Sequence, residues 1–199
     1  MCVICIKEKG VRMPTKSEIK DMWERNPDGA GFMYARDGEL HINKGYMSLP
    51  AFMEALQAAA IKESEPLILH FRISTQGGVN PGMCHPFPVS KRYADMDELE
   101  SSPEIGIAHN GIIQRCCKAN CKYSDTALFV TRYVSELIRK PSDLNKYALL
   151  EAISALAPNN RFALMNAKGK IATIGAFEQM DGLLYSNTFH VKNYRWWRK

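Results

Sequence analysis

The chain has 199 residues, of which 46% are apolar and 24% are charged, a balance typical of an ordinary folded protein rather than a disordered one. No apolar run approaches the ~18 residues that a membrane-spanning helix needs, and the first ten residues do not read as a secretory signal. The formal net charge of +5 is concentrated in the last ten residues, so the rest of the chain is nearly neutral and a nucleic-acid binder is not favoured.

Neither a repeat nor a Pro/Gly/Ser-rich linker divides the chain, so we expect one domain over residues 1–199 with a basic, aromatic tail over 190–199. Six cysteines without a recognisable signal peptide predict free thiols and a cytoplasmic location. The spacing of Cys116, Cys117 and Cys121 is not that of a known zinc motif, and we expect no metal site there. We expect the tail to dock on its own domain or on a partner chain rather than on nucleic acid.

The first half of the chain reads as strands around one helix. An apolar run over 3–6 predicts a strand, and apolar stretches on both sides of Asp37-Gly38 predict a hairpin over 31–46. A Ser48 cap and Pro50 in the first turn predict a helix over 48–61. A further strand is predicted over 67–73, with Arg72 at its polar end.

The second half reads as strands around two helices. A strand pair or a strand and turn is predicted over 105–113, around Asn110-Gly111, and helices are predicted from the apolar faces of residues 130–138 and 149–156. A hairpin over 161–177 that turns at 166–169 and a last strand over 183–186 complete the chain. Hairpins at both ends with helices between them predict a layered α+β or α/β fold rather than a doubly wound parallel sheet.

The first candidate for chemistry is Cys2. Methionine before a small residue is commonly removed after synthesis, which would leave Cys2 with both a thiol and a free α-amine. Because an α-amine has a pKa of about 7.7–8, it can act at neutral pH as a base toward its own thiol. The alternative is a buried, apolar cysteine at the start of the first strand.

Three further segments carry groups that could bind or activate a substrate, and each has a structural alternative. Arg72 can bind a carboxylate through two hydrogen bonds, or form a surface ion pair. The Asn110 side chain and the Gly111 N–H can form an oxyanion hole, or belong to a plain Asn-Gly turn. Asp125, beside Ser124 at the start of a helix, can bind an ammonium group or cap the helix.

Taken together, these segments resemble the class II glutamine amidotransferase domain, a family of the N-terminal nucleophile (Ntn) hydrolases. Besides Cys2, the resemblance is carried by Arg25-Asn-Pro-Asp28-Gly-Ala30-Gly31, His70-Phe-Arg72-Ile-Ser-Thr75-Gln-Gly77, His85-Pro86-Phe87, His109-Asn110-Gly111 and Ser124-Asp125-Thr126. Each motif is weak alone, whereas five in the family's order and at similar spacing are specific. The resemblance covers residues 2 to about 140, and the C-terminal third carries little signature.

The resemblance implies a fold and a reaction. The fold would be an α+β, four-layer αββα sandwich with two mostly antiparallel sheets between helix layers. Cys2 would attack the side-chain amide of glutamine with its own α-amine as base, and Asn110 and Gly111 would hold the oxyanion. The products would be a glutamyl thioester and ammonia, and then glutamate, with no metal or organic cofactor.

The resemblance also implies how the substrate is held. Arg72, assisted by the backbone near Thr75, would bind the α-carboxylate of glutamine, and Asp125 would bind its α-ammonium group. His85 would line the pocket, and Arg25 would support the surroundings of the nucleophile.

Three departures from the family pattern leave alternatives open. Val3, Gly29 and Ile73 stand where the family usually has glycine, serine and an aromatic residue. One alternative is therefore an Ntn cysteine amidohydrolase that acts on another small amide or γ-glutamyl compound. Another is a non-catalytic binding module that uses the tail or the cysteine loop. We expect any acceptor of ammonia to be a separate protein, since 199 residues leave no room for a synthase domain, and we expect no membrane partner. Self-association stays open.

Overall fold

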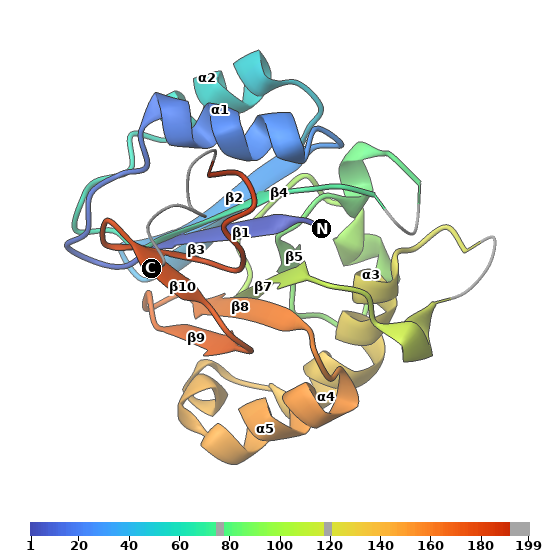
Figure 1. Cartoon of the computed structure of the whole chain (residues 1–199). Helices are drawn as coiled ribbons and strands as arrows, with labels where there is room; N and C mark the ends of the chain where they lie inside the picture. Colours follow the sequence, from blue (N-terminus) through green and yellow to red (C-terminus); the bar gives the residue numbers. More distant parts are fainter. Residues whose placement is uncertain (75–77, 118–120, 192–199) are drawn as a thin grey trace, which may run out of the picture.

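The computed structural model describes residues 1–74, 78–117 and 121–191. It shows a mixed α+β protein in which two antiparallel sheets pack face to face with helices outside them (Figure 1). The prediction of an α+β fold with antiparallel sheets is thereby confirmed. No helix of the described residues combines the length and the apolar character that a membrane span requires.

The first sheet has seven strands in the order β10-β11-β1-β4-β2-β3-β6, and the second has four in the order β5-β7-β8-β9. The strands of the first sheet are β1 Val3–Lys7, β2 Ala30–Arg36, β3 Glu39–Tyr46, β4 Leu67–Phe71, β6 Glu100–Ser101, β10 Glu178–Met180 and β11 Leu183–Tyr185. Those of the second sheet are β5 Phe87–Pro88, β7 Ile105–Asn110, β8 Arg161–Asn166 and β9 Ile171–Ile174.

The helices fall into two groups, one for each sheet (Figure 1). The α-helices are α1 Lys16–Arg25, α2 Leu49–Ala58, α3 Asp125–Phe129, α4 Ser135–Leu137 and α5 Tyr147–Leu156. Short 3₁₀ turns are η1 Pro81–Met83, η2 Tyr93–Met96, η3 Gln114–Cys116 and η5 Pro141–Asn145, and η4 Val130–Val134 is a π-helical segment. Helices α1 and α2 lie over the first sheet, and α3 and α5 lie over the second.

The strands bury both of their faces because successive side chains point to opposite sides. In β1, Ile4 and Ile6 pack between the two sheets, whereas Val3 and Cys5 pack under α1 and α2. On the far side of the second sheet, Phe162 packs with α3 and α5. This two-sided burial explains why β1 is a continuous apolar run rather than an alternating one.

The predicted hairpins are confirmed. Strands β2 and β3 pair around Asp37 and Gly38, which both have positive φ angles (52° and 84°), as a two-residue hairpin turn requires. Strands β8 and β9 pair as expected, and β11 follows at 183. Helix α5 ends at Leu156, two residues before Pro158.

Two predicted element ends are wrong. Helix α2 begins after its Ser48 cap but ends at Ala58, because the chain reaches a positive φ at Ala60. Strand β4 ends at Phe71 rather than at 73. Of the two alternatives for 105–113, the strand and turn is confirmed, since β7 ends at Asn110 and the chain turns at Gly111 with φ at 149°. The helix expected over 130–138 is present as η4 followed directly by α4, and its first part is π-helical.

Helix α1 was not predicted, although the sequence carries its start signal. Thr15 accepts a hydrogen bond from the Glu18 N–H at 3.2 Å, and the Glu18 carboxylate accepts one from the Thr15 N–H at 2.6 Å. This reciprocal pair is a capping box, whose pattern of Ser or Thr followed three residues later by Glu is readable from sequence. Helix α1 ends directly before the turn that carries Asp28.

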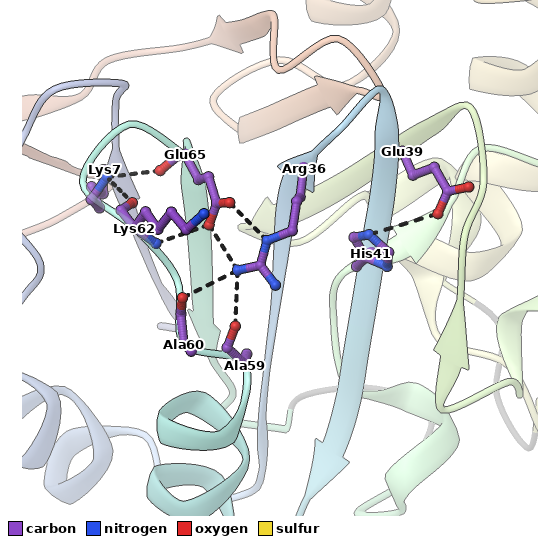
Figure 2. A network of polar contacts seen from close by, with 8 residues as sticks. All are labelled: Lys7, Arg36, Glu39, His41, Ala59, Ala60, Lys62 and Glu65. Carbon is purple, nitrogen blue, oxygen red and sulfur yellow. Dashed lines mark hydrogen bonds and ion pairs between the residues drawn. The ribbon is translucent and has the colours of Figure 1, made fainter.

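At the end of the sheet remote from Cys2, a polar network fastens the loop that precedes β4 (Figure 2). Arg36 donates to both carboxylate oxygens of Glu65 at 2.7 and 2.8 Å and to the Ala59 carbonyl oxygen at the end of α2. The buried Lys7 ammonium donates to the carbonyl oxygens of Glu63 and Glu65, both at 2.7 Å. Because each of these donors is matched to an acceptor, the loop is held rigidly onto β1 and β2.

We expect Glu65→Gln to destabilise the protein by about 2 kcal/mol at pH 7, because the Arg36 guanidinium loses its charged partner. The Arg36 hydrogen bonds lower the pKa of Glu65 from 4.5 to about 2. A carboxylate whose pKa is lowered by folding stabilises the folded protein at pH values above the pKa of the unfolded chain. This stabilisation is lost as the pH falls toward the pKa of the folded protein. The difference between wild type and variant should therefore shrink below pH 4.5. Urea unfolding across pH 7 to 3 measures it, with the exposed Glu63→Gln as control, and a constant difference would contradict the assignment.

Candidate active site

A small pocket, with a cavity volume of about 20 Å³, lies where β1 begins, β4 and β7 end, and α3 begins. Figure 1 places the N-terminus beside these strand ends and near α3. The pocket is lined by Cys2, Arg72, Ile73, His85, His109, Gly111, Ser124, Asp125 and Thr126. A larger hollow, of about 320 Å³, lies past the other end of β1 beside Lys9 and Lys62. We take the smaller pocket as the candidate site because it brings together a thiol, a guanidinium, a carboxylate and two imidazoles.

The Cys2 thiol is held against the backbone that follows β4. Its Sγ lies 3.4 Å from the Ile73 nitrogen, which donates to it, and 3.5 Å from the Ile73 oxygen. Burial raises the pKa of the Cys2 thiol, and the Ile73 N–H and the nearby Arg72 only partly offset this effect. The thiol is therefore protonated at neutral pH, and attack on a substrate requires a base.

Arg72 is fixed by the turn that precedes β2. Its N–H donates to the Gly29 oxygen at 2.8 Å, and its oxygen accepts from the Asp28 N–H at 3.0 Å. The Asp28 carboxylate accepts from the Ser74 N–H at 2.8 Å, and Arg72 Nη2 donates to the Gly78 oxygen at 2.7 Å. The strand end that carries the guanidinium is thus braced from two sides before any substrate arrives.

Arg25 does not line the pocket, and its expected role in supporting the nucleophile's surroundings stays a prediction. It is the last residue of α1, and its side chain is exposed. Within the same motif, Asp28 is the residue that contacts the site. Thr75 lies outside the described residues, so its expected role stays a prediction.

Asp125 stands at the first turn of α3 with its carboxylate at the pocket. Ser124 is the N-cap, and its Oγ accepts from the Ala127 N–H at 3.2 Å, so the predicted capping is confirmed. The Asp125 carboxylate accepts from the Ile113 N–H at 2.7 Å and from the Thr126 N–H at 2.8 Å. These bonds hold the carboxylate in place at the edge of the pocket, where it can accept a further hydrogen bond from a cation.

Three neutral histidines form the wall behind the pocket. His85 Nδ1 lies 3.1 Å from His70 Nε2, and both atoms lie near the His109 oxygen, at 3.2 and 3.0 Å. Burial lowers the pKa of all three imidazoles, to about 3 for His70. His85 lines the pocket as expected, and its neutral ring leaves the charge balance of the site to Arg72 and Asp125.

Asn160, which the sequence did not single out, fixes the turn that follows β7. Its Nδ2 donates to the oxygens of Ile112 and Pro158 at 3.3 and 3.0 Å, so its Oδ1 is the atom that lies 2.7 Å from His109 Nε2. His109 therefore carries its proton on Nε2, and its Nδ1 accepts from Thr126 Oγ1 at 2.7 Å. A side chain on Gly111 would place a Cβ 2.0 Å from Asn160 Oδ1, so only glycine fits beside this asparagine.

Of the predicted site residues, the structure brings Cys2, Arg72, His85, Gly111 and Asp125 to one pocket, and Asn110 lies directly behind it in β7. The cysteine loop is separate: Cys116 is buried, and Cys117 donates to the Ile113 oxygen at 3.5 Å. Across the parts of the chain that the structure describes, no group of three or more His, Cys, Asp or Glu side chains is placed to hold a metal ion. Of the tail, only His190 and Val191 are described, and His190 packs on Tyr185.

No model of a known protein family matches the chain, and no curated protein matches it.

Proposed function

We propose that this protein is an Ntn-type amidohydrolase that hydrolyses the side-chain amide of glutamine. The observation that carries the proposal is the convergence of Cys2, Arg72, Gly111 and Asp125 on one pocket from four separate parts of the chain. Two antiparallel sheets between helices are compatible with the αββα sandwich of the Ntn hydrolases and support the same assignment.

The proposed substrate is held by its two charged groups. Arg72 binds the α-carboxylate and Asp125 the α-ammonium group, which leaves the side-chain amide to reach Cys2. This arrangement selects a free amino acid over a peptide, because a peptide bond would remove one of the two charges. Ile73, which lines the same pocket, is the position at which another small amide would be accommodated.

The proposed reaction starts when the α-amine of Cys2 takes the thiol proton and Sγ attacks the amide carbon. The Gly111 N–H and the Asn110 amide stabilise the oxyanion of the tetrahedral intermediate. The protonated amine then gives its proton to the leaving nitrogen, ammonia departs, and a glutamyl thioester remains. Water, deprotonated by the same amine, hydrolyses the thioester to glutamate and restores the thiol. Ammonia made here would serve an acceptor on a separate protein.

The test compares two forms of the chain that differ only at the N-terminus, one beginning at Cys2 and the other retaining Met1. Release of glutamate and ammonia from glutamine should occur only with the first form, because a peptide bond to Met1 removes the basic amine. Intact mass establishes which form is present in protein from cells. If the form that begins at Cys2 releases neither product, glutamine is not the substrate, and a panel of small amides decides between another substrate and a binding module.

We expect kcat/KM of the Cys2 form to rise with pH between about 7 and 8.5, because the α-amine must be deprotonated to act as a base. Burial raises the pKa of the Cys2 thiol, so the thiol does not ionise by itself in this range. Rates measured at limiting glutamine give the pKa of the free enzyme, and rates at saturating glutamine give the pKa of the enzyme–substrate complex. Activity that is independent of pH over this interval would contradict the amine as base.

A further inference from the structure

The chain that leaves β11 runs directly behind the nucleophile, and two consecutive side chains in it contact the reacting residues. The Ser186 hydroxyl accepts from the Ile4 N–H at 2.9 Å and lies 2.9 Å from the side-chain amide of Asn110. The Asn187 side chain donates through Nδ2 to the Cys2 oxygen at 2.7 Å. Neither residue belongs to a motif that the sequence singled out, and both are buried.

The contact between Ser186 and Asn110 determines which way the Asn110 amide points. The hydroxyl has one proton, and it already accepts from Ile4. When Asn110 Nδ2 also donates to it, Asn110 Oδ1 is left buried without a hydrogen-bond partner among the described residues. When the amide is rotated by half a turn, Oδ1 accepts the Ser186 proton and Nδ2 becomes the unengaged atom. In the first state one N–H of Nδ2 is left for an oxyanion and in the second state both are, so the Ser186 hydroxyl sets how many donors Asn110 can offer and where they point.

Asn187 holds the backbone of the nucleophile itself. The amide that donates to the Cys2 oxygen has its own Oδ1 engaged by the Phe189 N–H at 3.3 Å, which fixes its orientation. The Ser186 N–H also donates to the Ile4 oxygen at 3.0 Å, so the segment continues the pairing of β11 with β1 to the edge of the site. When Met1 has been removed, Cys2 has no preceding peptide bond to restrain it. The hydrogen bond from Asn187 to the Cys2 oxygen then supplies that restraint.

We propose that Ser186 and Asn187 are positioning residues for the amide hydrolysis: Ser186 orients the oxyanion-binding amide of Asn110, and Asn187 holds Cys2 for attack. This inference rests on the proposed function. It predicts that the two side chains affect different steps. Loss of the Ser186 hydroxyl impairs stabilisation of the oxyanion but leaves the thiol in place, whereas loss of the Asn187 donor displaces the thiol.

The experiment uses the full chain beginning at Cys2 and two readouts, glutamine turnover and the rate at which iodoacetamide alkylates Cys2. Alkylation is a direct displacement that forms no oxyanion. We expect Ser186→Ala to lower kcat about 10- to 100-fold with KM nearly unchanged and alkylation unchanged, and Ser186→Thr to restore part of kcat. We expect Asn187→Asp, which replaces the donor with a carboxylate, to lower both turnover and alkylation. The matched controls are Ser135→Ala and Asn166→Asp, which alter buried residues remote from the pocket.

Three results would overturn the inference. The first is turnover within twofold of wild type in both variants. The second is a loss carried by KM rather than kcat, and the third is an equal loss of turnover and alkylation in Ser186→Ala, which a merely structural role would produce. If the Cys2 form does not hydrolyse glutamine at all, the proposed function fails, and the role of Asn187 is still decided by alkylation because that readout needs no substrate.

Discussion

Processed protein carrying Cys2→Ala is expected to hydrolyse glutamine at least about 10⁴-fold more slowly than wild type. The reason is that the proposed reaction forms a covalent bond to Sγ, and no other thiol lines the pocket. Binding should survive, because Arg72 and Asp125 are untouched and the loss of one sulfur leaves the strand pairing of β1 intact. Glutamine should therefore still protect the variant against thermal unfolding.

The matched control for this prediction is Cys117→Ala. Cys117 is also a free, partly buried cysteine, but its Sγ donates to the Ile113 oxygen and it is not among the residues that line the pocket. We expect this variant to keep wild-type kcat and KM in a coupled assay for glutamate. Full activity of the Cys2→Ala variant would contradict the covalent mechanism for any substrate.

Gly111→Ala is expected to lower kcat about 10²- to 10³-fold, the range seen when one oxyanion donor is lost. The added Cβ would lie 2.0 Å from Asn160 Oδ1 and 3.1 Å from His109 Nε2. Asn160 cannot move aside cheaply, because it is held by bonds to His109, Ile112 and Pro158. The φ of 149° adds strain for any residue with a side chain. The turn must therefore shift, and its N–H shifts with it.

The control is Gly38→Ala, at the far end of the β2–β3 hairpin. Gly38 also has a positive φ, of 84°, but an added Cβ there meets nothing within 4 Å. This variant should lose about 1 kcal/mol of stability and none of its activity. Urea unfolding of both variants measures the cost of backbone strain, and steady-state kinetics measures the effect of a misplaced N–H donor. Equal activity in Gly111→Ala and wild type would show that this N–H does not serve the oxyanion.

The elements that could be predicted from sequence are those whose signals are local. The Asp37-Gly38 hairpin and the Ser48 cap depend on a few adjacent residues, and each is where the sequence indicates. The capping box of α1, formed by Thr15 and Glu18, is an equally local signal. The helix over 130–138 was predicted from its apolar face at helical spacing, but that spacing carries no signal for the π-helical segment at its start.

In the candidate site, too, some residues were indicated by the sequence and others only by the structure. The sequence by itself indicated Cys2, Arg72, Gly111 and Asp125 as candidates, and the structure places all four at one pocket. It did not indicate that Asp28, rather than Arg25 of the same motif, contacts the backbone beside the site, because a motif does not say which of its members faces a neighbour. Only the tertiary structure revealed Asn160, Ser186 and Asn187. Their partners lie 51, 76 and 185 residues away in the chain, and a hydrogen bond over such separations exists only once the sheets have paired.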